Sequence, residues 1–63
     1  MKRRDIIKKL AKAGFVASEG ANHTKMSHPD GRWTVIGRHP EIPNGTVRAV
    51  ERQTGVKLRS EKG

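Results

Sequence analysis

The sequence predicts an α+β domain in which a helix, three strands and a second helix follow one another along the chain. Three observations predict it: apolar residues at helical spacing near the start, a Pro-Asp-Gly turn between two extended runs, and a second helical pattern that ends at a glycine. Two helices can cover one face of a three-stranded antiparallel sheet, which leaves the other face open.

The first helix is expected over residues 2–13, where apolar residues recur at helical spacing and lysines fill the opposite side. The apolar residues are Ile6, Ile7, Leu10 and Ala13, and the lysines are Lys8, Lys9 and Lys12. Gly14 follows as a left-handed C-terminal cap. Phe15 then carries the chain back toward the core.

A hairpin is expected in the middle of the chain. A short strand at residues 15–18 and a turn at residues 18–22 precede it, and its two strands occupy residues 23–28 and 32–36. The sequence His-Pro-Asp-Gly-Arg joins the two strands. In this turn proline sets φ, aspartate closes the turn and glycine takes a positive φ.

The register of the hairpin decides which side chains share a face. A type I turn at Pro29 and Asp30, with a bulge at Gly31, gives one core-like face and one basic face. The core-like face holds Thr24, Met26, Thr34 and Ile36, and the basic face holds His23, Lys25, Ser27, Trp33 and Val35. A two-residue Asp-Gly loop would instead place Met26 beside Val35.

A loop and a second helix complete the pattern. Residues 37–45 contain two prolines and two glycines, and they therefore form a loop across one end of the sheet. A helix is expected over residues 46–54, with Asn44 or Thr46 as its N-cap and Gly55 as its C-terminal stop.

The chain, residues 1–63, is expected to form a single domain with a frayed tail at residues 59–63. Val56 and Leu58 are expected to pack behind the second helix. Because the chain has no cysteine, a hydrophobic core must hold the fold without a disulfide or a cysteine-based zinc site. The element order is that of a double-stranded-RNA-binding-domain-like α-β-β-β-α sandwich.

The charge of the chain favours a polyanionic partner. It has 14 Lys and Arg against 6 Asp and Glu, which gives a net charge of +8 and an isoelectric point near 11.0. No apolar run approaches the roughly 20 residues of a membrane span, and the basic start lacks the apolar core of a signal peptide. We therefore expect a cytoplasmic protein that binds nucleic acid and no membrane.

Three histidines are candidates for chemistry, because the unperturbed pKa of imidazole lies closest to neutrality. His23 opens the second strand directly after a turn, where a side chain is anchored yet open to solvent, as suits a catalytic group. His28 occupies the first position of the next turn, and His39 lies in a loop where it can contact RNA phosphate. The histidines and carboxylates show no metal-ligand spacing, so no metal site is expected.

Other residues are candidates for RNA contact. Trp33 can stack on an unpaired base, form the centre of a protein interface or pack in the core. The candidates for phosphate contacts are Lys25, Arg32, Arg38 and Arg48. The chain has no phosphate-binding glycine loop, no cysteine nucleophile and no paired carboxylates, which disfavours other enzyme classes.

Together these pieces resemble the HicA family of toxins from bacterial and phage toxin–antitoxin systems. The opening helix DIIKKLAKAGF, the histidine segment and hairpin ANHTKMSHPDGR, and the loop and helix HPEIPNGTVRAVERQTGV follow in the order of that family. The resemblance covers nearly the whole chain. It implies a double-stranded-RNA-binding-like fold, cleavage of mRNA without a metal or other cofactor, and neutralisation by a HicB antitoxin.

The resemblance also implies a catalytic residue. His23 stands where the family has a histidine after a glycine-serine pair, and that pair is Ala21-Asn22 here. Neutral His23 would take the proton of a ribose 2′-hydroxyl, which then attacks the adjacent phosphorus, while Lys25 or Arg38 stabilises the added negative charge. The auxiliary candidates are Asn22, His28 and His39.

Alternatives stay open at this point. The acid that protonates the leaving oxygen is unassigned, and His28 can serve only if the register places it on the face of His23. An acidic antitoxin could cover His23, the basic face and Trp33. The chief rival is a non-enzymatic RNA-binding module in which the basic face grips phosphates. A DNA-binding or architectural protein is weaker, because neither helix looks like a recognition helix.

Overall fold

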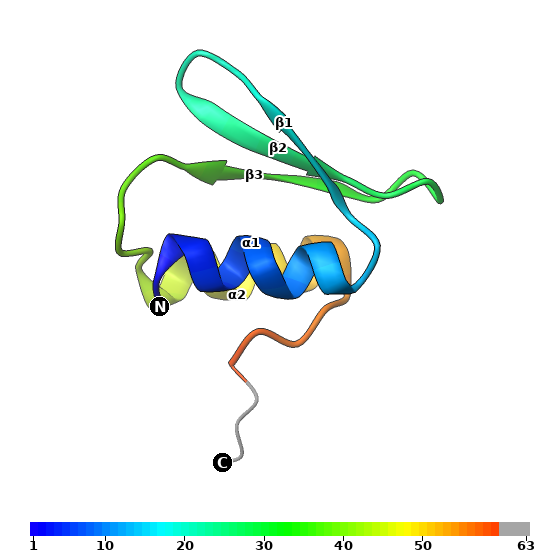
Figure 1. Cartoon of the computed structure of the whole chain (residues 1–63). Helices are drawn as coiled ribbons and strands as arrows, with labels where there is room; N and C mark the ends of the chain where they lie inside the picture. The colour runs from blue at the N-terminus through cyan, green and yellow to red at the C-terminus, as the bar shows by residue number, and fades with distance from the viewer. Residues whose placement is uncertain (60–63) are drawn as a thin grey trace.

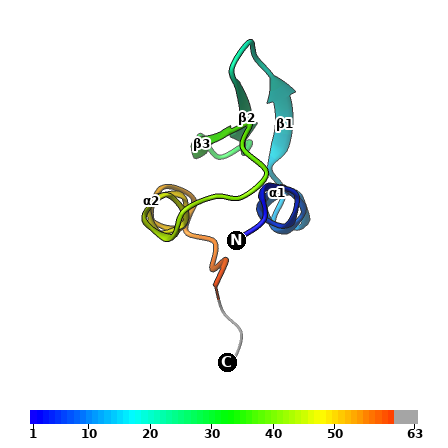
Figure 2. The ribbon, with the colours of Figure 1, turned by 90° about the vertical axis from the view of Figure 1, so that its left-hand side faces the viewer.

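Two helices form one layer of the molecule and a three-stranded antiparallel sheet forms the other (Figures 1 and 2). The computed structural model describes residues 1–59. The elements are α1 (Arg3–Lys12), β1 (Val16–Glu19), β2 (His23–Ser27), β3 (Trp33–Gly37) and α2 (Asn44–Thr54). Seen along the helices, α1 lies beneath β1 and α2 beneath β3 (Figure 2). The predicted α-β-β-β-α architecture, with both helices on one face, is therefore confirmed.

The helix α1 ends as its sequence predicts. Gly14 has a φ of 100°, and its N–H donates to the carbonyl of Ala11 at 3.0 Å. The N–H of Phe15 reaches back to the carbonyl of Leu10 at 3.0 Å, so the end is a Schellman motif. Ile6 and Leu10 are fully buried and Phe15 is 3% exposed, which directs the chain from the helix into the core.

The hairpin of β2 and β3 has the predicted turn. The carbonyl of His28 accepts from the N–H of Gly31 at 2.9 Å, and the N–H of His28 donates to the carbonyl of Arg32 at 2.8 Å. Gly31 has a φ of 103°, as a type I turn followed by a glycine bulge requires. Met26 therefore pairs with Thr34, and the alternative register that puts Met26 beside Val35 is wrong.

The first hairpin is tighter than predicted. β1 extends to Glu19, so the turn consists of residues 20–22 and is closed by the N–H of Gly20, which donates to the carbonyl of His23 at 2.8 Å. Glu19 lies opposite Thr24 in the ladder. Pairing with β2 thus extends β1 over a residue that the glycine and asparagine of the local sequence predict to lie in the turn.

The helix α2 begins earlier than predicted. Its N-cap is Pro43, whose extended backbone lets its carbonyl accept from the N–H of Val47 at 3.0 Å. Asn44 is then the first helical residue, so the expectation of Asn44 or Thr46 as N-cap is wrong, and no side chain caps this end. The C-terminal stop is confirmed, because Gly55 takes a φ of 74° and its N–H donates to the carbonyl of Glu51 at 2.8 Å.

The segment after α2 folds back onto the helix. The carboxylate of Glu51 accepts from the N–H groups of Leu58 at 2.7 Å and Arg59 at 3.0 Å. Leu58 is 2% exposed and joins the core, and Val56 packs against it while partly buried. The end of the predicted tail, residues 60–63, lies outside the described residues.

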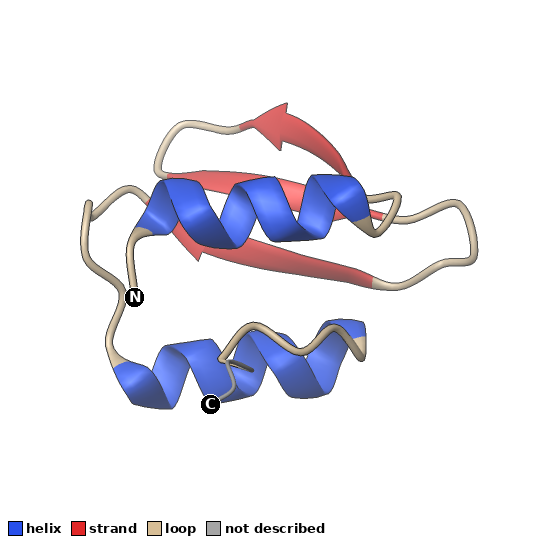
Figure 3. Ribbon diagram, turned by 60° about the horizontal axis from the view of Figure 1, so that its bottom comes forward, coloured by secondary structure: helices blue, strands red, loops and turns tan. Residues whose placement is uncertain are grey.

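The N-terminus is bound to the loop that precedes α2 (Figure 3). The N–H of Ile42 donates to the carbonyl of Met1 at 2.8 Å, and the N–H of Arg3 donates to the carbonyl of Pro40 at 2.9 Å. The amino group of Met1 also lies 3.0 Å from the carboxylate of Glu41. The start of α1 is thus placed beside the end of β3.

The core lies between the sheet and the helices. Its hydrophobic members are Ile6, Leu10, Phe15, Met26, Ile36, Ile42, Val47, Val50 and Leu58. Three threonines, Thr24, Thr34 and Thr54, are buried with them. Each of their hydroxyls has a hydrogen-bond partner, so burial leaves none of them unsatisfied.

Candidate active site

The outer face of the sheet, on the side away from the helices, carries the candidate site. Alternation along the strands turns Thr24, Met26, Thr34 and Ile36 toward the helices. The outer face is formed by Val16, Ser18, His23, Lys25, Ser27, Trp33 and Val35. No other element of the described chain covers this face (Figure 2). The face assignment made from the hairpin turn is therefore confirmed.

His23 lies at one end of the outer face. It is the first residue of β2 and pairs with Gly37, which has no side chain to cover it. The His23 side chain is exposed, and it forms no ion pair or side-chain hydrogen bond with residues 1–59. Its backbone is held by the tight turn through the hydrogen bond from Gly20. The imidazole is thus anchored at its base and free to accept a proton at its tip.

A shallow depression of about 440 Å³ opens in front of His23. It is lined by Ser18, Glu19, Gly20, Ala21, Asn22, His23, Lys25 and Val35. The auxiliary candidate Asn22 therefore belongs to the wall of this depression, next to the imidazole in the chain. A shallow and open site fits an extended chain such as RNA better than a buried small molecule.

Arg38 lies at the same end of the sheet and is held in place. It follows Gly37, and its guanidinium donates to Glu19 Oε1 at 2.9 Å and to the carbonyl of Gly20 at 2.6 Å. The Arg38 side chain remains 48% exposed. Its position is fixed by the same turn that fixes His23, which leaves part of the guanidinium available to an anion.

Glu19 and Arg3 tie this end of the sheet to α1. The hydroxyl of Thr24 donates to Glu19 Oε1 at 2.9 Å and accepts a hydrogen bond from the guanidinium of Arg3. Arg3 Nε also donates to the carbonyl of Gly37 at 3.0 Å. Sequence reasoning missed both residues, because Glu19 was placed in a turn and Arg3 is distant in the chain. A β1 extended by one residue would have identified the pairing of Glu19 with Thr24.

Lys25 and Trp33 continue the outer face away from His23. The ammonium of Lys25 lies 5.0 Å from the centre of the Trp33 ring, within the range of a cation–π contact. Trp33 is 55% exposed, so core packing is not its role. With Val16 and Val35, it forms the exposed apolar part of the outer face.

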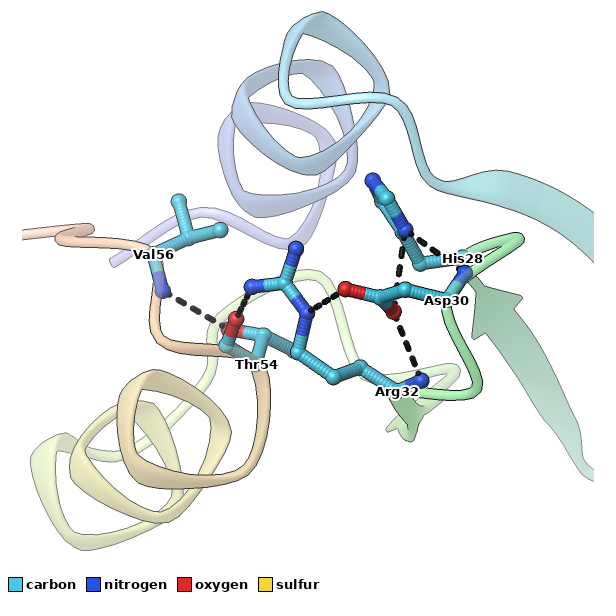
Figure 4. Close-up of polar contacts among 5 residues, drawn as sticks. All are labelled: His28, Asp30, Arg32, Thr54 and Val56. Carbon is cyan, nitrogen blue, oxygen red and sulfur yellow. Dashed lines mark hydrogen bonds and ion pairs between the residues drawn. The ribbon is translucent and has the colours of Figure 1, made fainter.

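His28 and Arg32 lie at the opposite end of the hairpin (Figure 4). The ring of His28 meets Phe15 edge-on at 5.0 Å, and its Nδ1 accepts from the N–H of Asp30 at 3.1 Å. The same nitrogen lies 3.0 Å from Asp30 Oδ1, but an Nδ1 that accepts from an N–H carries no proton to donate.

Arg32 is engaged on three sides at this turn. Its Nε donates to Asp30 Oδ2 at 2.7 Å, its guanidinium donates to the carbonyl of Thr54, and it lies 5.3 Å from the centre of the Phe15 ring. The hydrogen bond from the main-chain N–H of Arg32 is the largest of the effects that lower the pKa of Asp30 below its ordinary value. The turn is thus tied to the end of α2.

The structure brings some of the predicted residues together and separates others. His23, Asn22 and Lys25 line one depression of the outer face, and Arg38 lies at the same end of the sheet, bound to Glu19 and followed by His39 in the loop. His28 is five residues from His23 on the helix side of β2, roughly 16 Å along the strand, so it does not face His23. Arg48 is an exposed residue of α2, which covers the other side of the sheet.

Among residues 1–59, no group of three or more His, Asp or Glu is placed to hold a metal ion. The helices in that part of the chain are too short and too polar to cross a membrane.

A known protein family matches most of the chain. Residues 3–56 of the 63 residues match the family model described as HicA toxin of bacterial toxin-antitoxin. The match runs from the first residue of α1 to Val56, so it includes every helix and strand described above. Among curated proteins, none matches the chain.

Proposed function

Because the chain belongs to the HicA family of toxins, and is thus a toxin of a toxin–antitoxin system, we propose that it is a metal-independent endoribonuclease that cleaves mRNA. The observation that carries this proposal is the setting of His23. Its imidazole is exposed and unpaired among the described residues, with Lys25 two residues along the same face and Arg38 next to its cross-strand partner Gly37. One base with flanking cations is what cleavage of a ribose phosphodiester needs.

In the proposed reaction, His23 takes the proton from a ribose 2′-hydroxyl. The 2′-oxygen then forms a bond to the adjacent phosphorus, and the bond from phosphorus to the 5′-oxygen breaks. The products are a 2′,3′-cyclic phosphate and a 5′-hydroxyl, whose oxygen takes its proton from water, since His28 lies at the far end of β2. DNA has no 2′-hydroxyl and is not a substrate.

Arg38 and Lys25 stabilise the negative charge that develops on the phosphoryl oxygens. Glu19 and the carbonyl of Gly20 hold the Arg38 guanidinium before substrate arrives, so little reorganisation is needed. Asn22 and His39 are assigned auxiliary contacts with the RNA near the cleaved linkage. One positioned base contributes about 10² to 10⁴ in rate, so we expect slow turnover.

We further propose that a HicB-type antitoxin neutralises the toxin by covering the outer face. The exposed apolar residues Val16, Trp33 and Val35 supply the contact area, and Lys25 adds positive charge beside them. The net charge of +8 would steer an acidic partner to this surface. Because His23 lies on the same face, a protein bound there would exclude RNA.

The test of the ribonuclease proposal compares the parent protein with His23→Ala on mixed-sequence single-stranded RNA in excess EDTA. Arg52→Ala is the control, because Arg52 is exposed on α2 and pairs with no carboxylate among residues 1–59. We expect cleavage by the parent and by Arg52→Ala, with cyclic phosphate ends, and none by His23→Ala. Circular dichroism must show that all three proteins are folded.

Two results would contradict this proposal. Cleavage by His23→Ala at the rate of the parent would remove His23 from the chemistry. Intact RNA with every protein, while RNA binding persists, would favour the alternative of a non-enzymatic RNA-binding module.

A further inference from the structure

A second basic surface adjoins the outer face at the His23 end. It is a depression of about 490 Å³ between the start of α1 and the loop after β3, and we call it the basic cleft. It is lined by Lys2, Arg3, Arg4, Arg38 and Pro40. Two segments more than thirty residues apart in the chain thus bring four cationic side chains to one hollow.

The carboxylates around the basic cleft leave it positive. Glu41 lies 3.0 Å from the amino group of Met1 and 3.7 Å from Lys2 Nζ, and Glu19 lies 2.9 Å from Arg38. Arg4 is exposed and forms no ion pair or side-chain hydrogen bond with the part of the chain that is described. Within residues 1–59 the positive charge of the cleft therefore exceeds the negative charge beside it, and an anion bound there would be stabilised.

The basic cleft adjoins the site of His23. Arg3 Nε donates to the carbonyl of Gly37, the cross-strand partner of His23, at 3.0 Å. Paired Cα atoms in an antiparallel ladder lie about 5 Å apart. Arg38 lines the cleft and is also bound to Glu19 in the wall of the depression in front of His23. A strand of RNA leaving His23 can therefore pass from one hollow directly into the other.

We propose that the basic cleft binds the phosphodiester backbone of the RNA strand next to the linkage that is cleaved, with Arg4 as a phosphate contact at its rim. The location beside the cleaved linkage rests on the ribonuclease proposal. Arg3 also ties α1 to this end of the sheet through its hydrogen bonds to Thr24 and Gly37. The contacts are to phosphate, so the cleft adds affinity without sequence preference.

The test measures binding of a single-stranded 2′-O-methyl RNA of about eight nucleotides across a range of salt concentrations. Such RNA has no free 2′-hydroxyl and is not cleaved, so binding is read apart from catalysis. Arg4→Ala is compared with Arg52→Ala, because both remove one arginine from an exposed helix position. Arg52 lies in the last turn of α2, at the end of the molecule that carries the hairpin turn.

We expect Arg4→Ala to lower the slope of log K against log salt by about 0.7, the value for one phosphate contact on a single strand. We also expect a loss of affinity of about fivefold at low salt for Arg4→Ala, a larger loss for Arg4→Glu, and less than about twofold for Arg52→Ala. Equal losses for Arg4→Ala and Arg52→Ala would overturn the proposal, because the effect would then be one of net charge. Unchanged binding by Arg4→Ala would overturn it as well.

Cleavage of unmodified RNA separates this proposal from the ribonuclease proposal. If the parent cleaves RNA and Arg4→Ala binds RNA as the parent does, the ribonuclease proposal holds and the proposal for the basic cleft is wrong. If the parent leaves RNA intact, while Arg4→Ala but not Arg52→Ala loses affinity for RNA and salt dependence, the basic cleft is an RNA site and the ribonuclease proposal is wrong.

Discussion

The guanidinium of Arg32 donates a hydrogen bond to the carbonyl oxygen of Thr54, the last residue of α2 (Figure 4). The carbonyls at the end of a helix lack partners within the helix and carry partial negative charge. A cation from the β2–β3 turn supplies such a partner here. Arg32 is therefore a tie between the sheet and α2 at the end of the molecule opposite His23.

Replacing Arg32 tests this tie. We expect Arg32→Ala to lower the free energy of unfolding by about 1 to 2 kcal/mol, a charge-assisted hydrogen bond discounted for partial exposure. Arg32→Lys should recover only part of the loss, because an ammonium cannot bond Asp30 and Thr54 as a planar fork does. Urea unfolding measures both, with Arg52→Ala as the control. A stability equal to that of the parent would leave RNA contact as the role of Arg32.

Two glycines with nearly the same φ form a matched pair. Gly14 has a φ of 100° and Gly31 a φ of 103°, but a Cβ at Gly14 would lie 3.0 Å from His28 Nε2 and one at Gly31 meets nothing within 4 Å. We expect Gly31→Ala to cost about 1 to 2 kcal/mol through backbone strain alone. Gly14→Ala should cost more, because the His28 ring must also move from Phe15. Thermal or urea unfolding compares them, and equal costs would contradict the contact with His28.

Acid should destabilise the fold through three carboxylates. The pKa of Glu51 is lowered by hydrogen bonds from the main-chain N–H groups of Arg59 and Leu58, that of Glu41 by a hydrogen bond from the N-terminal ammonium, and that of Asp30 by the N–H of Arg32. A carboxyl with a lowered folded pKa stabilises the fold above its unfolded value and loses this effect as pH falls through the folded value.

The ordinary pKa values are 4.5 for the two glutamates and 3.8 for the aspartate. We therefore expect the urea midpoint to be level near neutral pH and to fall as the pH drops below about these values. Glu51→Gln should be less stable at neutral pH and should show a weaker fall in acid. A parent midpoint that stays constant down to pH values well below these would contradict the predicted effect.

Trp33 should matter more for the antitoxin than for the fold. It is 55% exposed, and its described ring contact is with Lys25, so Trp33→Ala should change the free energy of unfolding by less than about 1 kcal/mol. We expect the same change to weaken binding of a HicB-type antitoxin by about 10- to 100-fold, as for an aromatic at the centre of an interface. Isothermal titration calorimetry measures the affinity. Lys9→Ala on α1 is the control, and an equal loss there would contradict docking on the outer face.

Local signals in the sequence were sufficient for most of the fold. The cap at Gly14, the bulged turn at Gly31 and the stop at Gly55 each depend on a backbone conformation that glycine favours, and each was predicted where it occurs. The N-cap of α2 was not, because Pro43 has no side-chain acceptor and its role depends on the backbone alone. The end of β1 was misplaced because pairing with β2 overrides the turn preference of its residues.

Only part of the candidate site could be predicted from the sequence. The place of His23 on an open face follows from hairpin register, and so do the positions of Lys25 and Trp33. Arg38 was a candidate by charge alone, and its fixation by Glu19 requires the first hairpin to bring them together. Arg3 and Arg4 are not among the site residues that the sequence predicts, because nothing local links the start of α1 to the end of β3.

The sequence by itself determined the order of the elements, the glycine stops after both helices and the place of the hairpin turn. These depend on φ preferences and on periods of about two and 3.6 residues, which are local. Only the tertiary structure decided that the start of α1 meets the end of β3 and that four cations share one cleft. It also decided that Arg32 contacts the end of α2 and lies far from His23. Long side chains reach partners many residues away, and their contacts exist only once the layers have packed.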